Sequence, residues 1–311
     1  MRGCAAGRRR APTAPGPLIR RFSRFACIDW SGAQGRWQRG IAVAQCAAGD
    51  AAPELVVPPG RHWSRAAVLD WLLDQAAADA DLLVGIDFSP SLPFDPLDGY
   101  LPGVADVPRD AAGLWRAVDT ACIADPHLAA TSFVRRPDVA RLFRIGAATG
   151  DRFAHPVDRN GRLRVAERHP DCGRPSSVFN LVGAAQVGLS SLTGMRVLHR
   201  LGGRIPVWPF DPAPAAGPLI VEVYTSIAAI AAGRPRGATK MRSIEALDRA
   251  LAAPGIASVP IDGHGPIDDH RSDALLTAAW LRRVAGRAAL WSPAALTRTL
   301  AATEGWTFGL S

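Results

Sequence analysis

Three short runs of consecutive apolar residues mark the chain, and each contains or ends at an acid. Runs of this length, bounded by Ser, Gly and Pro, are typical of strands that are buried on both faces. Burying a carboxylate without a partner is costly, so each of these acids needs one. The runs are Phe25–Ile28 followed by Asp29, Leu82–Ile86 followed by Asp87, and Leu219–Val223, which encloses Glu222.

The remaining pattern predicts two further strands and several helices. Ile41–Ala44 and Glu54–Pro59 have strand character, and the first forms a hairpin with Phe25–Ile28. Ser64 is a candidate helix start, and Gly202 with Gly203 marks a helix end. Apolar residues at helical spacing predict helices over residues 64–80, 110–124, 176–203, 243–253 and 267–286. This order indicates a mixed α/β domain whose sheet is covered on both faces.

Composition narrows the class of protein. The 311 residues are 48% hydrophobic and 21% charged, which is ordinary for a globular domain. No apolar run reaches 18 residues and no signal-peptide core follows the first arginines, so we expect a cytoplasmic protein without a membrane partner. The five cysteines form no CxxC pair, which favours reduced thiols over a zinc ribbon.

The net charge of +8 is distributed unevenly. Residues 1–23 are rich in Arg and Pro, and we interpret them as a disordered tail. Residues 25–130 carry a net charge of −8, whereas residues 131–205 carry +8. A basic segment next to an acidic one suits a nucleic acid that approaches carboxylates holding cations. The alternative is compositional, because Arg is the default surface cation of a chain with a single lysine.

The densest basic cluster is interleaved with aromatic residues. Phe133 and Phe143 lie among the arginines and could stack on a base while the guanidinium groups bind phosphates. A solvated helix face is an equally good interpretation. The candidate nucleic-acid-binding residues are Arg135, Arg136, Arg141 and Arg144.

The last predicted helix adds acids to the three strand acids. Asp269 and Asp273 are spaced i, i+4, and His270 and Asp273 are spaced i, i+3, so either pair projects from one face. Clustered carboxylates repel one another unless cations neutralise them, and oxygen ligands without Cys favour Mg²⁺ or Mn²⁺. Two such ions could clamp an in-line displacement at phosphorus. The alternative is local, since Asp29 and Asp87 could cap the turns that follow them and Asp269 could favour the helix dipole.

Five sequence blocks together resemble the DUF429 family of predicted RNase H-like nucleases. In order, they are FACIDWSGA, VGIDFSPSLP, VWPFDPAPAAGPLIVEVYTS, DDHRSDALLTAAW and EGWTFGL, and they run from Phe25 to Leu310. The spacing in HRSD also resembles the last-helix pair of some Holliday-junction resolvases. One departure is that Thr225 follows Tyr224, where the family often has Pro.

The resemblance implies an RNase H-like fold, a five-stranded mixed sheet flanked by helices. Acids lie on its first, fourth and fifth strands and on its last helix, and by position they are Asp29, Asp87, Glu222 and Asp273. We expect one such domain over residues 24–311, with a largely helical basic insertion at about 95–205 before the last core strand.

We therefore expect divalent-metal-dependent hydrolysis of phosphodiester bonds in DNA or RNA. Asp29 would bridge two ions, Asp87, Glu222 and Asp273 would be further ligands, and His270 or Asp269 would complete the site or position water. The Ser-Gly-rich turn after Asp29 would let the backbone approach a phosphate. One alternative is an actin-like ATP-dependent phosphotransferase, whose second Asp-Gly-Gly hairpin and adenosine pocket we do not find. Another is a catalytically inactive nucleic-acid-binding protein.

Overall fold

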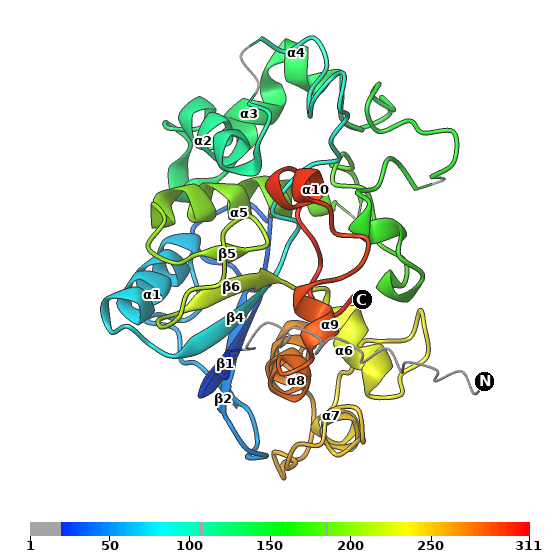
Figure 1. Ribbon diagram of the computed structural model, residues 1–311. Helices are drawn as coiled ribbons and strands as arrows, with labels where there is room; N and C mark the ends of the chain where they lie inside the picture. Colours follow the sequence, from blue (N-terminus) through cyan, green and yellow to red (C-terminus); the bar gives the residue numbers. More distant parts are fainter. Residues whose placement is uncertain (1–19, 106–107, 159, 184–185) are drawn as a thin grey trace, which may run out of the picture.

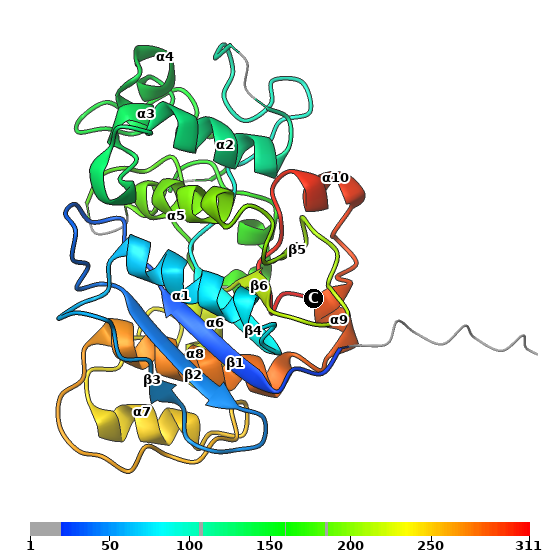
Figure 2. The same cartoon turned by 90° about the vertical axis from the view of Figure 1, so that its left-hand side faces the viewer.

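A six-stranded mixed sheet forms the centre of the protein (Figures 1 and 2). The computed structural model describes residues 20–105, 108–158, 160–183 and 186–311. The strand order is β3-β2-β1-β4-β6-β5, with β1, β2 and β3 antiparallel and β4, β6 and β5 parallel to β1. The strands are β1 (Arg24–Asp29), β2 (Ala42–Ala47), β3 (Glu54–Leu55), β4 (Leu82–Asp87), β5 (Val207–Trp208) and β6 (Leu219–Glu222).

All five strands predicted from the sequence are present. The sheet has six strands, however, one more than the five-stranded sheet that the resemblance implies. The additional strand is β5, two residues long, which pairs with β6 at the edge of the sheet. An edge strand this short leaves no periodic pattern in the sequence. The strand predicted over Glu54–Pro59 contains only two residues, Glu54 and Leu55.

Helices cover both faces of the sheet, as predicted (Figures 1 and 2). Helices α1 and α5 pack on one face, with α2 on their outer side, and α6, α7 and α8 pack on the other. The helices are α1 (Arg65–Ala77), α2 (Ala111–Ala121), α3 (Thr131–Arg135), α4 (Pro137–Ala140), α5 (Val187–Leu201), α6 (Thr225–Ala231), α7 (Ile244–Leu251), α8 (Asp269–Val284), α9 (Ala288–Trp291) and α10 (Arg298–Ala302). Among the described residues, none of the helices is long and apolar enough to cross a membrane.

The start of α5 differs from the prediction. We expected the helix from residue 176, but it begins at Val187. The backbone of the preceding segment is used elsewhere, because Phe179 O accepts from Arg144 N (2.9 Å) and Leu181 N donates to Arg144 O (3.1 Å). A contact between segments distant in sequence therefore overrides the local helical pattern. The predicted end is correct, since Gly202 caps α5 in the left-handed conformation.

The predicted insertion and tail also have different limits. Helix α5 falls inside the range 95–205 but packs on the sheet, so it belongs to the layer that covers the core. Between residues 95 and 186 the described part of the chain forms α2, the short helices α3 and α4, three short 3-10 helices and long irregular segments. Residues 1–19 of the expected tail lie outside the described residues, whereas Phe22 is buried and Arg20 pairs with Asp81.

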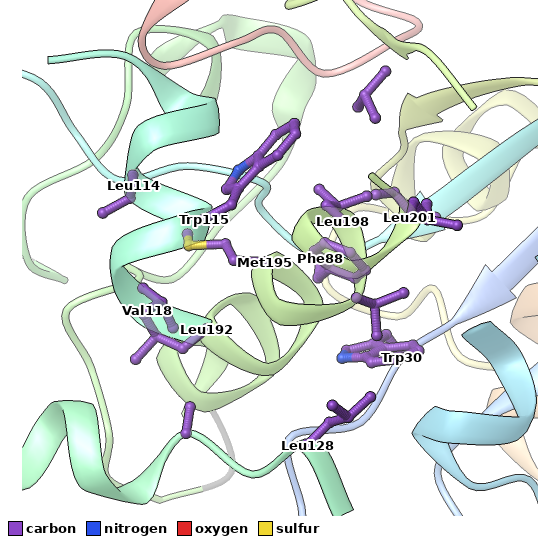
Figure 3. Close-up of a cluster of buried hydrophobic side chains, with 14 of the residues drawn as sticks. Trp30, Phe88, Leu114, Trp115, Val118, Leu128, Leu192, Met195, Leu198 and Leu201 are labelled. Atoms are coloured by element: carbon purple, nitrogen blue, oxygen red, sulfur yellow. The ribbon is translucent and has the colours of Figure 1, made fainter. Parts of the chain in front are cut away.

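Two aromatic side chains fix the ends of β1 and β4 (Figure 3). Trp30 and Phe88 directly follow Asp29 and Asp87, and their ring centroids lie 5.4 Å apart beneath α5. Trp30 Nε1 donates to Thr193 Oγ1 of α5 (3.1 Å). Because side chains alternate along a strand, anchoring these rings on the α5 face directs the two preceding carboxylates to the opposite face.

Gly194 of α5 makes this aromatic contact possible. A Cβ atom at Gly194 would lie 2.4 Å from the Phe88 ring. We predict that Gly194→Ala lowers the free energy of unfolding by about 1–3 kcal/mol through overpacking, although alanine is the better helix former. The control is Gly286→Ala, where nothing lies within 4 Å of the new Cβ and no loss is expected. Urea unfolding measures both, and a Gly194→Ala protein as stable as the wild type would contradict this packing.

Candidate active site

Asp29 and Asp87 form the centre of the candidate site. They are the last residues of β1 and β4 and stand opposite each other in the parallel register, where neighbouring strands are about 4.8 Å apart. Asp29 is buried and Asp87 is half-buried, and both line a cavity of about 290 Å³. The predicted convergence of these two acids at one edge of the sheet is therefore present.

Helix α8 supplies His270 and Asp273 to the same place. His270 Nδ1 lies 3.0 Å from Asp29 Oδ1, so the carboxylate of Asp29 is bonded to α8. Asp273 is buried one turn further on and does not line the cavity itself, but its charge acts on Asp87. The cap of α8 is Asp268, which accepts from Arg271 N (2.9 Å). Asp269 is the first residue of the helix and does not line the cavity, so it is neither the cap nor part of the cavity wall.

Lys240 is a member of the site that the sequence analysis missed. Its ammonium group bonds to Asp273 Oδ2, and its side chain is half exposed and lines the cavity. The charges of Asp29 and Asp87 also act on it. One signal was present in the sequence, because Lys240 is the only lysine among 36 basic residues. Lysine offers a compact point charge, whereas arginine presents a wide planar fork.

Asp87 is oriented by the first residue of α6. The Thr225 hydroxyl donates to Asp87 Oδ2 (3.2 Å), and Thr225 N lies 3.4 Å from Asp87 Oδ1. Proline, which the resembled family often has here, could supply neither contact. Asp87 therefore bonds to α6 and does not cap the turn that follows it.

The carboxylates of Asp29, Asp87 and Asp273 have too few positive charges near them to neutralise them. Burial raises the pKa of Asp87 to about 8, and the negative charges of Asp29 and Asp273 add to this effect. Burial also raises the pKa of Asp273 to about 6, although Lys240 opposes the rise. Both shifts mean that the ionised carboxylates are disfavoured as they stand. A further cation between them would favour their ionised forms.

Glu222 does not join this cluster. It pairs with Ile86 in the sheet and shares the α5 face with Ile220, whereas Asp29 and Asp87 lie on the α8 face. Arg164 Nη1 donates to Glu222 Oε2 (2.9 Å), and Arg164 Nη2 bonds to Oε1. Thr307 Oγ1 also donates to Oε1 (3.1 Å). Glu222 thus lines the cavity with a cation of its own.

Arg164 is the second residue that the sequence analysis missed. It is fully buried and also bonds to Glu167 Oε1 (2.9 Å). Burial disfavours the charged guanidinium, but Glu222 and Glu167 outweigh this effect and raise the pKa of Arg164. The irregular segment around it gives no pattern that would reveal its partner 58 residues away.

The turn after Asp29 serves packing. A Cβ atom at Gly32 would lie 2.4 Å from Ser190 N of α5, so the glycine allows close approach of the turn to the helix. Arg65 donates to Ser31 O (3.1 Å) and also bonds to Ala33 O. Gly32 thus has a packing role, and the approach of this turn to a phosphate stays a prediction.

The predicted arginine cluster lies apart from the cavity. Arg136 pairs with Asp138 (2.7 Å) and Arg141 with Asp151 (3.1 Å). The two interleaved phenylalanines are buried in the core and cannot stack on a base, which corrects that part of the prediction. All four arginines are exposed and none lines the cavity; they are Arg135, Arg136, Arg141 and Arg144.

Asp29 and Asp87 are suited to a divalent ion. In the part of the chain that the structure describes, no three His, Cys, Asp or Glu side chains converge as a complete metal site. Mg²⁺ does not require one, since it is commonly bound by one or two carboxylates together with water and substrate phosphate. Two carboxylates at adjacent strand ends, with excess negative charge, match that donor set.

The chain matches no protein-family model, no curated protein and no solved structure.

The raised pKa of Asp87 predicts how stability depends on pH in EDTA. Unfolded aspartate titrates near pH 4, so between about pH 4 and 8 the folded protein retains a proton that the unfolded chain has lost. The raised pKa of Asp87 therefore contributes its full stabilisation of the fold below about pH 4, and this contribution is lost as the pH rises through about 8. We predict that Asp87→Asn is more stable than the wild type at pH 9 and that the difference shrinks towards pH 5.

Urea unfolding in EDTA at several pH values measures this difference. Asp70→Asn, at an exposed position of α1, removes the same charge and should show no comparable trend. An Asp87→Asn protein less stable than the wild type at every pH would contradict the charge deficit.

The ion pair between Arg164 and Glu222 predicts that substitutions at these two residues change the free energy of unfolding non-additively. Arg164→Met should cost about 3–5 kcal/mol, because it leaves buried carboxylates without their cation. The double variant Arg164→Met/Glu222→Gln should lose less than the sum of the two single losses. A double-mutant cycle by urea unfolding measures the coupling. The exposed Arg141–Asp151 pair is the control and should show coupling of about 0–1 kcal/mol; additive losses at Arg164 and Glu222 would refute the ion pair.

Proposed function

We propose that this protein is a divalent-metal-dependent phosphodiesterase that acts on nucleic acid, with an RNase H-like fold and membership of the DUF429 family that it resembles. The observation that carries the proposal is the pair Asp29 and Asp87, in register at the ends of adjacent parallel strands, with Asp273 beside them. The sheet order supports it, because β6 can serve as the fifth core strand and β5 as an added edge.

The metal-binding part of the proposal rests on Asp29 and Asp87. These residues would hold Mg²⁺ or Mn²⁺ together with a substrate phosphate oxygen. The ion would supply Lewis-acid activation of a water and stabilise the leaving oxygen. Thr225 keeps Asp87 oriented, and Lys240 neutralises Asp273. Glu222, bonded to Arg164, would support the cavity wall and would not bind the ion.

His270 is the proposed proton acceptor. With Asp29 ionised and the ring neutral, His270 would donate from Nδ1 and leave Nε2 to accept a proton from water. The hydrogen bond with Asp29 raises the pKa of His270, which makes the ring a stronger base. The ring lines the cavity and its side chain is 41% exposed, so water can reach it. Gly40 leaves space beside it, because a Cβ atom there would lie 3.2 Å from Nε2. Asp29 would thus position the base and bind the ion.

Two measurements test the proposal together. We predict that Mn²⁺ raises the melting temperature of the wild type and supports cleavage of labelled single-stranded, duplex or branched DNA or RNA, and that EDTA abolishes both effects. Asp29→Asn should lose the Mn²⁺-dependent stabilisation and at least ~100-fold in cleavage, since even residues behind metal ligands commonly contribute about 10–100-fold. Asp70→Asn is the control for a removed carboxylate and should behave as the wild type.

The opposite results identify the alternatives. Neither cleavage nor Mn²⁺-dependent stabilisation in the wild type would contradict the proposal and favour an inactive nucleic-acid-binding protein. Stabilisation by ATP without cleavage would favour the phosphotransferase class.

A further inference from the structure

A second cavity, of about 380 Å³, lies beside the candidate active site and shares Tyr224 and Lys240 with it. Among the described residues that line it, none is acidic and four are cationic, namely Arg174, Arg234, Arg236 and Lys240. The site thus has an acidic part around Asp29 and Asp87 and an adjoining basic part, which we call the basic cavity.

The cations of the basic cavity are only partly neutralised. Arg174 is exposed and lines the cavity, and Arg234 Nε is buried without a hydrogen-bond partner among the described residues. Arg236 pairs with Asp171 at 3.2 Å, but both side chains are more than half exposed, so water weakens the pair. The cavity therefore presents excess positive charge to a ligand.

Lys240 connects the two cavities. Its ammonium group bonds to Asp273 at the acidic part, and its residue also lines the basic cavity. The backbone around it belongs to the same wall, because Arg234 Nη2 donates to Lys240 O (3.4 Å). A phosphodiester strand with one phosphate at Asp29 and Asp87 would therefore have its neighbouring phosphates beside Lys240 and the three arginines.

We propose that the basic cavity binds the backbone phosphates of the nucleic-acid strand on one side of the bond to be cleaved. This inference rests on the proposed function for its substrate class, although the binding itself requires no metal ion. It places the nucleic acid at Arg174, Arg234 and Arg236. The arginines that the sequence favoured are a poorer site, because none of them lines either cavity.

The test is binding of a fluorescein-labelled single-stranded oligonucleotide in EDTA, measured by anisotropy at several salt concentrations. Arg174→Gln/Arg236→Gln should weaken binding by about 10-fold or more. The slope of log K against log salt concentration should become shallower by roughly 0.7 for each lost phosphate contact. The matched control is Arg135→Gln/Arg144→Gln, which removes two exposed arginines of the other cluster and should change affinity less than about 2-fold. All four positions are exposed, and circular dichroism melting verifies the fold.

Three results would overturn the inference. The first is equal or greater weakening by the control variant, and the second is the absence of salt-dependent binding by the wild type. The third is binding of inorganic triphosphate as tightly as the oligonucleotide, which would assign the cavity to a free polyphosphate. Because binding is measured in EDTA, a protein that binds the strand here but never cleaves it would contradict the proposed reaction and leave this inference intact.

Discussion

The repulsion between the carboxylates at the ends of β1 and β4 is the constraint on which the site depends. Parallel pairing of the two strands places Asp29 opposite Asp87, and α8 adds Asp273. Such an arrangement persists only where other contacts hold it and cations offset it. Trp30 and Phe88 hold the strand ends beneath α5 (Figure 3). Lys240 and His270 bond to two of the acids.

The sheet separates two electrostatic systems that meet at its end. On the α8 face, three acids share one lysine, and their pKa values are raised. On the α5 face, Glu222 and Glu167 surround the buried Arg164, whose pKa is also raised. The first system has excess negative charge and is suited to an added cation. The second is neutralised by direct ion pairs and is suited to holding the cavity wall rigidly.

The function of positive charge in this protein depends on its location. The net charge of +8 and the basic segment 131–205 predicted that exposed arginines of this segment bind nucleic acid. Those arginines line neither cavity, whereas the basic cavity is lined by residues from two segments that the chain brings together around Tyr224. The proposed binding of phosphates beside the acids rests on this juxtaposition and on no property of the total charge.

The sequence by itself determined the strands that end in acids, the hairpin of β1 and β2, the helix that carries His270 and Asp273, and the two covered faces of the sheet. These features follow from local apolar patterns of strand and helix. Only the tertiary structure decided which acids act together. Glu222 meets Arg164 from an irregular segment, and Lys240 reaches Asp273 from a loop. Neither contact has a local pattern, because strand register and loop packing determine which side chains meet.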